Sequence, residues 1–394
     1  MSSAKVLYNF HRASRKNVDG TLPQDSLISD SAGNLYGTTV GGGAFEDGTV
    51  FELTLANGSW TETVLHSFSG PDGSEPWAGL TFDASGNLYG TTVEGGPHGN
   101  GVVFELISNG DQTWTEKILF DFYGTHGKNG EFPAGGLIFD AAGNLYGTTR
   151  LGGVAGLGTV FELMPTIEGN WKEKLLHHFN ADAKHGSYPL CTLAFDAEGN
   201  LYGTTSDVDS LSGPTLAFGT VFELSPTVSE SWKFTILHKF TFDGKDGFTP
   251  VAGVILDSAG SLYGTTLRGG IGPGIVYELM PKGNGSWTEK ILRKFKGGTQ
   301  DGANPFAGVT FDATGNLYGT TMIGGTDSVG TVFELSPALG GGWTEQILHK
   351  FKSDPNDGNV PYGGVILDSE GNLYGTTIGG GDQGGGGTVY EIPR

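Results

Sequence analysis

Cysteine and positive charge are both scarce in this chain, and each shortage excludes a class of function. Cys191 is the only cysteine among 394 residues, so the sequence predicts neither an internal disulfide framework nor a multi-cysteine metal site. Lysine and arginine number 22 against 43 aspartates and glutamates, which gives a net charge of −21 and a pI near 4.7. Because nucleic-acid phosphates are bound by basic surfaces, we expect no nucleic-acid partner.

Long apolar runs are also missing. No segment approaches the roughly 18 apolar residues that a membrane-spanning helix needs, so we expect no membrane insertion. The first ten residues, MSSAKVLYNF, lack the apolar stretch of a signal peptide. An acidic, soluble chain fits an extracellular or periplasmic setting, but the sequence leaves the native compartment unknown.

Glycine, in contrast, is abundant and follows a repeat. The chain contains 70 glycines, and the heptapeptide GNLYGTT begins at residues 33, 86, 143, 199, 315 and 371, with GSLYGTT at 260. Glycine does not occur at every third position, and aromatic residues make up 11% of the chain, which argues against collagen and against disorder. The glycines therefore indicate tight turns between short strands.

Each repeat contains four short segments rich in β-branched and aromatic residues. One unit reads WTEKILRKF (287–295), GVTFDATG (308–315), NLYGTT (316–321) and GTVFEL (330–335). No segment has a sustained helical period, so the sequence predicts an all-β fold: one seven-bladed β-propeller domain, residues 1–394, with four antiparallel strands per blade. The seven units span about 5–59, 60–113, 114–170, 171–231, 232–286, 287–342 and 343–394.

The two ends of the chain indicate how the ring closes. Residues 5–10, KVLYNF, resemble the end of a Trp-led segment, and the chain finishes on TVYEIPR, which resembles GTVFEL. If GVxFD forms the innermost strand of each blade and the Trp-led segment the outermost, the last blade lacks its outer strand. We therefore expect residues 5–10 to supply that strand. We also expect the glycine after the repeated tyrosine, such as Gly319, to leave room for an aromatic ring of the adjoining blade.

The repeated G-N-L-Y-G-T-T, then G-G, then G-T-V-F-E-L resembles the GloVer-type tandem repeat of secreted or surface-anchored bacterial proteins. The resemblance extends over residues 5–394. It implies export from the cytoplasm, although this chain shows neither a signal peptide nor an anchor. The architecture is also similar to the propellers of streptogramin lyases and NHL-repeat proteins, which is an analogy of fold.

The long loops should share one face of the disc, and polar departures from the repeat gather there in units two to four. Histidine suits general acid–base chemistry near neutral pH, and arginine can bind a carboxylate or an oxyanion. The alternative is that these residues are solvated loop positions. The candidate catalytic residues are His126, His185, Arg150, Asp207 and Glu94.

Aromatic residues lead into the inner strand of several units and could form flat platforms at the central opening. Sugars and aromatic small molecules bind to such platforms, with a few polar groups to orient them. The alternative is that these rings pack loop against loop. The candidate ligand-binding residues are Trp77, Phe306, Tyr362, Tyr188, Arg268, His11 and Asp25.

Two recurring patterns are interpreted as structural. Histidine recurs as L-H-x-F in the outer strands, which favours packing, and aspartate recurs in the Asp-Gly loops and hairpin turns, where it can cap a turn. The alternative for the ring of Asp-Gly loops is calcium, which needs about six to eight oxygens around one point, and one aspartate per blade does not supply them. No His-x-His or His-x-x-x-His spacing occurs, so the sequence assigns no metal ligands and we expect no bound cofactor, while calcium binding stays open. The residues concerned are His66, His177, His238, His349, Asp19, Asp72, Asp246, Asp301 and Asp357.

Three functions remain open. The first is a monomeric binding module with one asymmetric site for a small molecule or glycan. The second is a metal-independent lyase, isomerase or cyclase that uses the histidines and Arg150. The third is a protein-interaction scaffold with a broad apolar patch. Departures confined to a few units favour a single site over one site per blade.

Overall fold

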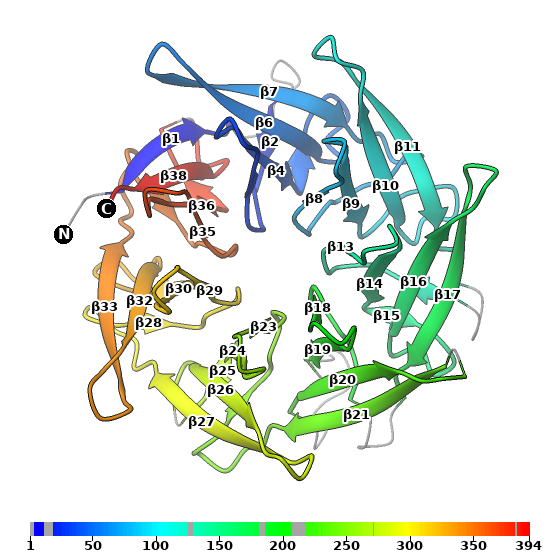
Figure 1. Cartoon of the computed structure of the whole chain (residues 1–394). Helices are drawn as coiled ribbons and strands as arrows, with labels where there is room; N and C mark the ends of the chain where they lie inside the picture. Colours follow the sequence, from blue (N-terminus) through cyan, green and yellow to red (C-terminus); the bar gives the residue numbers. More distant parts are fainter. Residues whose placement is uncertain are drawn as a thin grey trace.

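The computed structural model describes residues 4–11, 19–124, 129–180, 186–206, 218–229, 231–270, 272–382 and 384–394. Among these residues there are strands and turns but no helix, and hence no helix long and apolar enough to cross a bilayer. Seven four-stranded antiparallel sheets stand around a central axis as the blades of a propeller (Figure 1). The predicted fold is thus confirmed.

The blades are numbered in chain order, and the strands of each run from the axis outward. They are blade 1, β3 (Ile28–Ser29), β4 (Leu35–Thr39), β6 (Thr49–Ala56), β7 (Ser59–Ser67); blade 2, β8 (Thr81–Phe82), β9 (Leu88–Thr92), β10 (Val102–Ser108), β11 (Trp114–Asp121); blade 3, β13 (Ile138–Phe139), β14 (Leu145–Thr149), β16 (Thr159–Pro165), β17 (Trp171–His178); blade 4, β18 (Ala194–Phe195), β19 (Leu201–Thr205), β20 (Thr220–Pro226), β21 (Trp232–Lys239); blade 5, β23 (Ile255–Leu256), β24 (Leu262–Thr266), β26 (Ile275–Pro281), β27 (Trp287–Lys294); blade 6, β29 (Thr310–Phe311), β30 (Leu317–Thr321), β32 (Thr331–Pro337), β33 (Trp343–Lys350); and blade 7, β35 (Ile366–Leu367), β36 (Leu373–Thr377), β38 (Thr388–Ile392), β1 (Lys5–Asn9).

Blade 7 is assembled from both ends of the chain, as the sequence predicts. Strand β1 pairs antiparallel with β38, and Lys5 lies opposite Glu391. Phe10, the residue after β1, is fully buried and packs against Leu27 and Phe51 of blade 1. The first strand of the chain therefore joins the last blade to the first.

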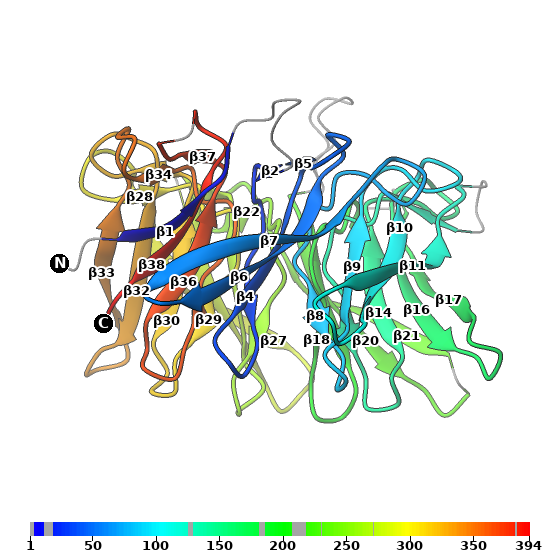
Figure 2. The same cartoon turned by 90° about the horizontal axis from the view of Figure 1, so that it is seen from above.

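Ten shorter strands form two-stranded ribbons that join the two sets of long loops. The ribbons lie along one edge of the disc (Figure 2), which confirms that both loop sets share a face. They are β2 (Gly20–Thr21) with β5 (Gly41–Gly42), β12 (Gly130–Glu131) with β15 (Leu151–Gly152), β22 (Gly247–Phe248) with β25 (Arg268–Gly269), β28 (Gly302–Ala303) with β31 (Ile323–Gly324), and β34 (Gly358–Asn359) with β37 (Gly379–Gly380).

The aspartate of each inner hairpin caps its own turn. In blade 1 the Asp30 carboxylate accepts hydrogen bonds from the amides of Ala32 and Asn34, and Gly33 adopts a φ of 84°. The Tyr36 hydroxyl, which also contacts this carboxylate, donates to Glu52 of β6 at 2.8 Å. The interpretation of the hairpin aspartates as turn caps is therefore confirmed.

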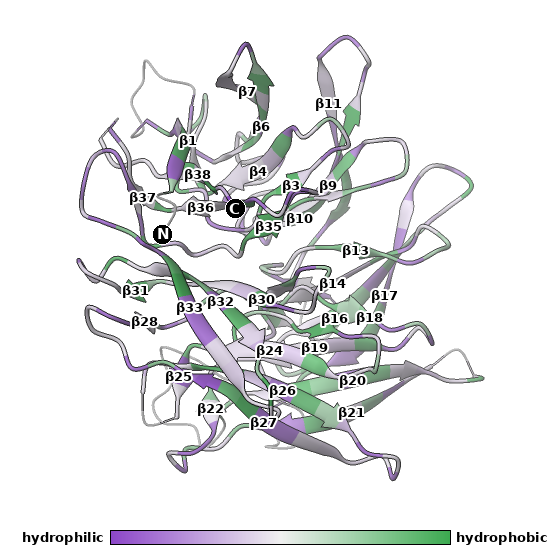
Figure 3. Ribbon diagram, turned by 60° about the vertical axis from the view of Figure 1, so that its left-hand side comes forward, coloured by the Kyte–Doolittle hydropathy of each residue, from purple (hydrophilic) through white to green (hydrophobic). Residues whose placement is uncertain are grey.

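The hydrophobic core is divided among the interfaces between blades. Third strands such as β20 and β26 are hydrophobic, whereas outer strands such as β27 and β33 carry hydrophilic segments (Figure 3). The glycine after the repeated tyrosine packs against an aromatic ring, but the predicted origin of that ring is wrong. Gly319 lies opposite Phe333 of its own blade, and a Cβ added to Gly319 would stand 2.6 Å from the Phe333 ring.

Neighbouring blades are also joined near the axis by a hydrogen bond that is repeated at all seven interfaces. The first threonine of each LYGTT strand donates its hydroxyl to a backbone carbonyl at the start of the next blade, at 2.8 to 3.3 Å. Thr376 of blade 7, for example, donates to the carbonyl of Asp25 in blade 1. The repeated threonine therefore fixes each blade relative to its neighbour.

Candidate functional site

A cavity of about 450 Å³ lies on the axis of the ring, at the end that bears the long loops. Its wall comes from a segment of the form P-x-x-x-(L or V) that leads into the inner strand of each blade. The residue after the proline lines the cavity in all seven blades: Gln24, Trp77, Ala134, Leu190, Val251, Phe306 and Tyr362.

The backbone before each of these prolines is held in an unusual conformation. In all seven blades the residue before the proline has a φ between 55° and 61°, the left-handed region that side chains rarely adopt. These residues are Leu22, Glu75, Phe132, Tyr188, Thr249, Asn304 and Val360. The repeated conformation gives the seven wall segments one geometry, so the cavity differs from blade to blade through its side chains.

The side chains of the wall divide the cavity into two unlike sides. Phe306, Tyr362 and Trp77 belong to blades 6, 7 and 2, and the two rings of Phe306 and Tyr362 lie 4.5 Å apart at 46°. Gln24 of blade 1 stands between Tyr362 and Trp77 in the order of the ring. The other side, from blades 3 to 5, carries only small and aliphatic residues at this position.

Asp25 is the one carboxylate among the described residues that line the cavity. One of its oxygens accepts a hydrogen bond from the amide of Ser26, and the other accepts from the amide of Gly79 in blade 2, both at 2.6 Å. Burial raises the pKa of the Asp25 carboxyl, and these amide hydrogen bonds oppose that rise. The aromatic side of the cavity thus holds a carboxyl that favours its protonated form more than a solvated one does.

Two other polar residues of the wall, Ser26 and Thr192, hold neighbouring blades together. The Ser26 hydroxyl accepts from the amide of Gly364, and the Thr192 hydroxyl accepts from the amide of Gly136. Cys191 is 1% exposed, and burial raises the pKa of its thiol, so it is a small buried residue of the wall.

The sequence candidates therefore separate into two groups. Trp77, Phe306, Tyr362 and Asp25 line the cavity. Tyr188 does not, because it precedes its proline, while the wall residues follow theirs.

The other charged candidates that the structure describes lie outside the cavity wall. Glu94 and Arg268 are exposed and belong to the loop face, and Arg150 is half-buried, its amide bound to the carbonyl of Phe132. His11 lies near the start of the chain, with its ring nitrogen 2.9 Å from Asp19. The cavity therefore collects three of the four aromatic candidates and none of the described basic ones.

Three of the candidate catalytic residues, His126, His185 and Asp207, fall outside the described residues. Their roles stay predictions.

The recurring histidines pack as predicted but also form polar contacts that the sequence analysis missed. The rings of His66, His177, His238 and His349 each contact, edge-on, the phenylalanine two residues later. Three of them also face the aspartate of the following Asp-Gly loop: His66 with Asp72, His238 with Asp246 and His349 with Asp357. The spacing L-H-x-F followed within eight residues by Asp-Gly is the sequence signal of these pairs.

Comparison with known proteins places the chain in a repeat family. The model of the Gloeobacter/Verrucomicrobia repeat matches residues 1–216 and 210–394. The chain belongs to the Gloeobacter/Verrucomicrobia repeat family. A search of curated proteins finds no match to this repeat protein.

Solved structures also resemble this Gloeobacter/Verrucomicrobia repeat protein. One of them, from Bacteroides uniformis, is provisionally named a 6-phosphogluconolactonase. The two chains align with a TM-score of 0.50 and 14% sequence identity, over 89% of this chain and 87% of the other. At that identity the likeness concerns the fold alone.

Proposed function

We propose that this propeller binds one neutral small molecule, such as a mono- or disaccharide, in its axial cavity. The observation that carries the proposal is the arc of Phe306, Tyr362 and Trp77, which surrounds Gln24 and Asp25 on one side of the wall. A cavity of about 450 Å³ lies within the usual range of roughly 300–1,000 Å³ for small-molecule sites.

The chemistry of the wall favours a sugar-like ligand. Aromatic faces pack against the apolar C–H faces of a pyranose ring, while Gln24 and the Asp25 carboxyl can bind its hydroxyl groups. No lysine, arginine or histidine occurs among the described residues that line the cavity. A phosphate or carboxylate ligand would therefore lack a counter-charge, and the net charge of −21 would repel it.

The named activity of the Bacteroides uniformis protein does not change this conclusion. A phosphorylated sugar would need a cationic partner, which the described wall does not offer. We therefore infer an unphosphorylated ligand.

Intrinsic fluorescence and isothermal titration against a panel of neutral sugars, with their 6-phosphates alongside, test the proposal. We expect saturable binding of one neutral sugar per chain, and a loss of at least about tenfold in affinity for Trp77→Ala and Tyr362→Ala. The control is Phe45→Ala, which removes a 60% exposed aromatic outside the cavity wall. Equal loss in all three variants, or preference for the phosphorylated sugars, would contradict the proposal.

A metal-independent enzyme is the second candidate, and Asp25 is the observation that favours it. A carboxyl with a raised pKa beside a bound sugar can act as a general acid or base. We propose this role for Asp25 in place of the described basic candidates, since Arg150 lies outside the wall. If the sugar identified by titration is turned over, Asp25→Asn should abolish turnover and leave its affinity within a few fold.

The third alternative, a protein-interaction scaffold, has less support. Three of the most exposed large apolar side chains, Ile167, Val228 and Leu339, occur one each in the outer hairpins of blades 3, 4 and 6. Single apolar residues on separate hairpins differ from the broad patch that a protein partner requires.

A further inference from the structure

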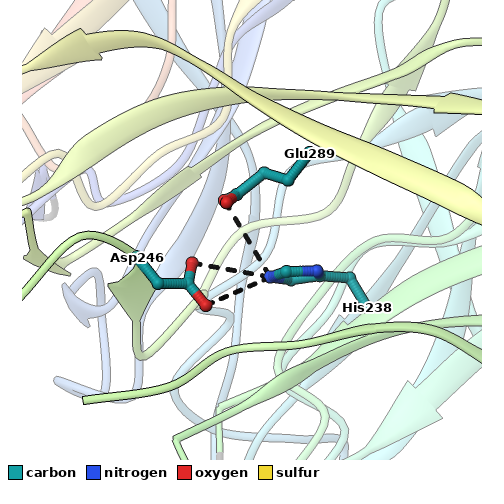
Figure 4. Close-up of side chains that lie close together, drawn as sticks. All are labelled: His238, Asp246 and Glu289. Atoms are coloured by element: carbon teal, nitrogen blue, oxygen red, sulfur yellow. Dashed lines mark hydrogen bonds and ion pairs between the residues drawn. The ribbon is translucent and has the colours of Figure 1, made fainter. Parts of the chain in front are cut away.

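Three side chains with metal-binding atoms meet between the outer strands of blades 4 and 5. His238 belongs to β21, Asp246 to the loop after it, and Glu289 to β27 of the next blade (Figure 4). The His238 Nε2 atom lies 3.3 Å from one Asp246 oxygen and 3.9 Å from Glu289 Oε1. Residues distant in sequence thus place one nitrogen and two carboxylates around a common point.

The spacing of these atoms fits a divalent transition metal. One ligand atom from each residue lies within 4.8 Å of the other two, and the described residues contain no other such group. Zinc binds nitrogen and oxygen at about 2.0–2.2 Å, so two tetrahedral ligands stand roughly 3.4 Å apart. The His238–Asp246 distance meets that value, and a small rotation of Glu289 would bring its oxygen into range.

The environment orients the ligands and leaves an entrance. The Asp246 carboxylate is fixed by the amides of Thr241 and Gly247 at 2.9 and 2.7 Å. Glu289 Oε1 is buried and has no hydrogen-bond partner, although it faces His238. The side chains of His238 and Glu289 are 20% and 17% exposed, so an ion can reach them and retain a water ligand.

The neighbouring interface shows that this place accepts a positive group. Between blades 5 and 6, Arg293 occupies the position of His238, and its guanidinium lies 2.8 Å from Asp301 and 2.5 Å from Glu345. Two carboxylates that face each other across a partly buried gap repel unless a cation separates them. Blades 4 and 5 have the same two acids but a histidine in place of the permanent cation.

The interface between blades 1 and 2 retains the same three residue types, as His66, Asp72 and Glu116. Among the described residues, however, only the set between blades 4 and 5 brings one ligand atom of each residue within 4.8 Å of the other two.

Two other interfaces lack the glutamate. Between blades 6 and 7, His349 still pairs with Asp357, but Ala4 occupies the position of the glutamate. Between blades 3 and 4, Phe234 replaces the glutamate and stacks on His177 with ring centroids 3.9 Å apart. At both of these interfaces the residue that replaces the glutamate carries no carboxylate.

We propose that His238, Asp246 and Glu289 bind one divalent transition metal of the zinc class, which links blade 4 to blade 5. The ion neutralises the two carboxylates, as Arg293 does at the next interface. This site lies at the outer edge of the ring, apart from the axial cavity, so its occupancy does not depend on the proposed ligand.

The test uses the full chain, freed of metal by a chelator and titrated with Zn²⁺ by calorimetry and with Co²⁺ by absorption. We expect one equivalent of tight binding, visible Co²⁺ bands of a low-coordinate N/O site, and a rise in Tm with Zn²⁺. His238→Ala and the near-isosteric Glu289→Gln should each lower affinity by about 100-fold or more, beyond the roughly 10–100-fold typical of outer-shell changes.

The matched control is His349→Ala, which removes the same histidine–aspartate pair where no glutamate is present. It should leave the stoichiometry and affinity unchanged, and circular dichroism should show that every variant is folded. Absence of stoichiometric binding to the wild-type chain, or equal binding by wild type and Glu289→Gln, would overturn the proposal.

Discussion

Closure of the ring by the first strand can be tested through Phe10, which anchors β1 to the rest of the protein. The Phe10 side chain is fully buried in one hydrophobic cluster with Leu27, Leu35 and Phe51 of blade 1, and its ring centroid lies 5.0 Å from that of Phe51. Replacement of a buried phenylalanine by alanine costs about 3–5 kcal/mol. In Phe10→Ala we expect most of this loss, together with weaker pairing of β1 with β38.

Hydrogen exchange and urea denaturation measure the two effects separately. The control is Phe351→Ala, which empties the equivalent position in blade 6, where all four strands are continuous in sequence. Both variants should lose similar unfolding free energy, but only Phe10→Ala should speed exchange of the amides in residues 388–392. A loss below about 1 kcal/mol, or unchanged exchange in β38, would refute closure by β1.

Three further outcomes are expected. Thr148→Val should cost about 1–3 kcal/mol in urea denaturation, because it leaves the buried carbonyl of the next blade without its 2.9 Å hydrogen bond, whereas Thr148→Ser should retain it. Burial raises the pKa of Glu173 to about 8, so the folded state retains a proton that the unfolded chain releases, and stability should fall as the pH rises from about 4.5 to 8. Glu173→Gln should remove that part of the pH dependence, and an unchanged profile would contradict it. Val360→Asn should raise the free energy of unfolding, measured by urea denaturation, by up to about 1 kcal/mol, because asparagine tolerates a φ of 57° better than valine. Asn304 occupies the same position in blade 6. A lower free energy of unfolding would show that the packing of the Val360 side chain outweighs the backbone strain.

The fold could be predicted from the sequence because its signals are local and repeated. In six of the seven blades the four strands lie within about fifty residues, and hairpin residues such as Asp30 and Gly33 adopt the conformations that their chemistry favours. The packing partner of Gly319 was harder to predict, because a glycine indicates that another group approaches closely but does not indicate which strand carries that group. Cross-strand register assigns Phe333 of the same blade to that place.

The candidate site could be predicted only where one position in each repeat faces the axis. Trp77, Phe306 and Tyr362 share that position, so their aromatic character was informative. Arg150 departs from the repeat as strongly, yet it lies outside the cavity wall. A residue that departs from the repeat does not by itself indicate whether its side chain faces the axis. His238 and Glu289 lie in different repeats, and their proximity could not be predicted without the relative orientation of blades 4 and 5.

The axial wall shows why a repeat protein can hold a single asymmetric site. Seven prolines follow residues held at a φ of 55° to 61°, and seven threonine hydroxyls fix each blade to the next, so the backbone of the wall is the same in every blade. A strained conformation is retained in seven copies only if the surrounding structure enforces it. With the backbone fixed in this way, one substitution after a proline changes the cavity without changing the ring. Specificity can therefore reside in Trp77, Phe306, Tyr362 and the Gln24–Asp25 pair, while the repeated residues keep the blades in place.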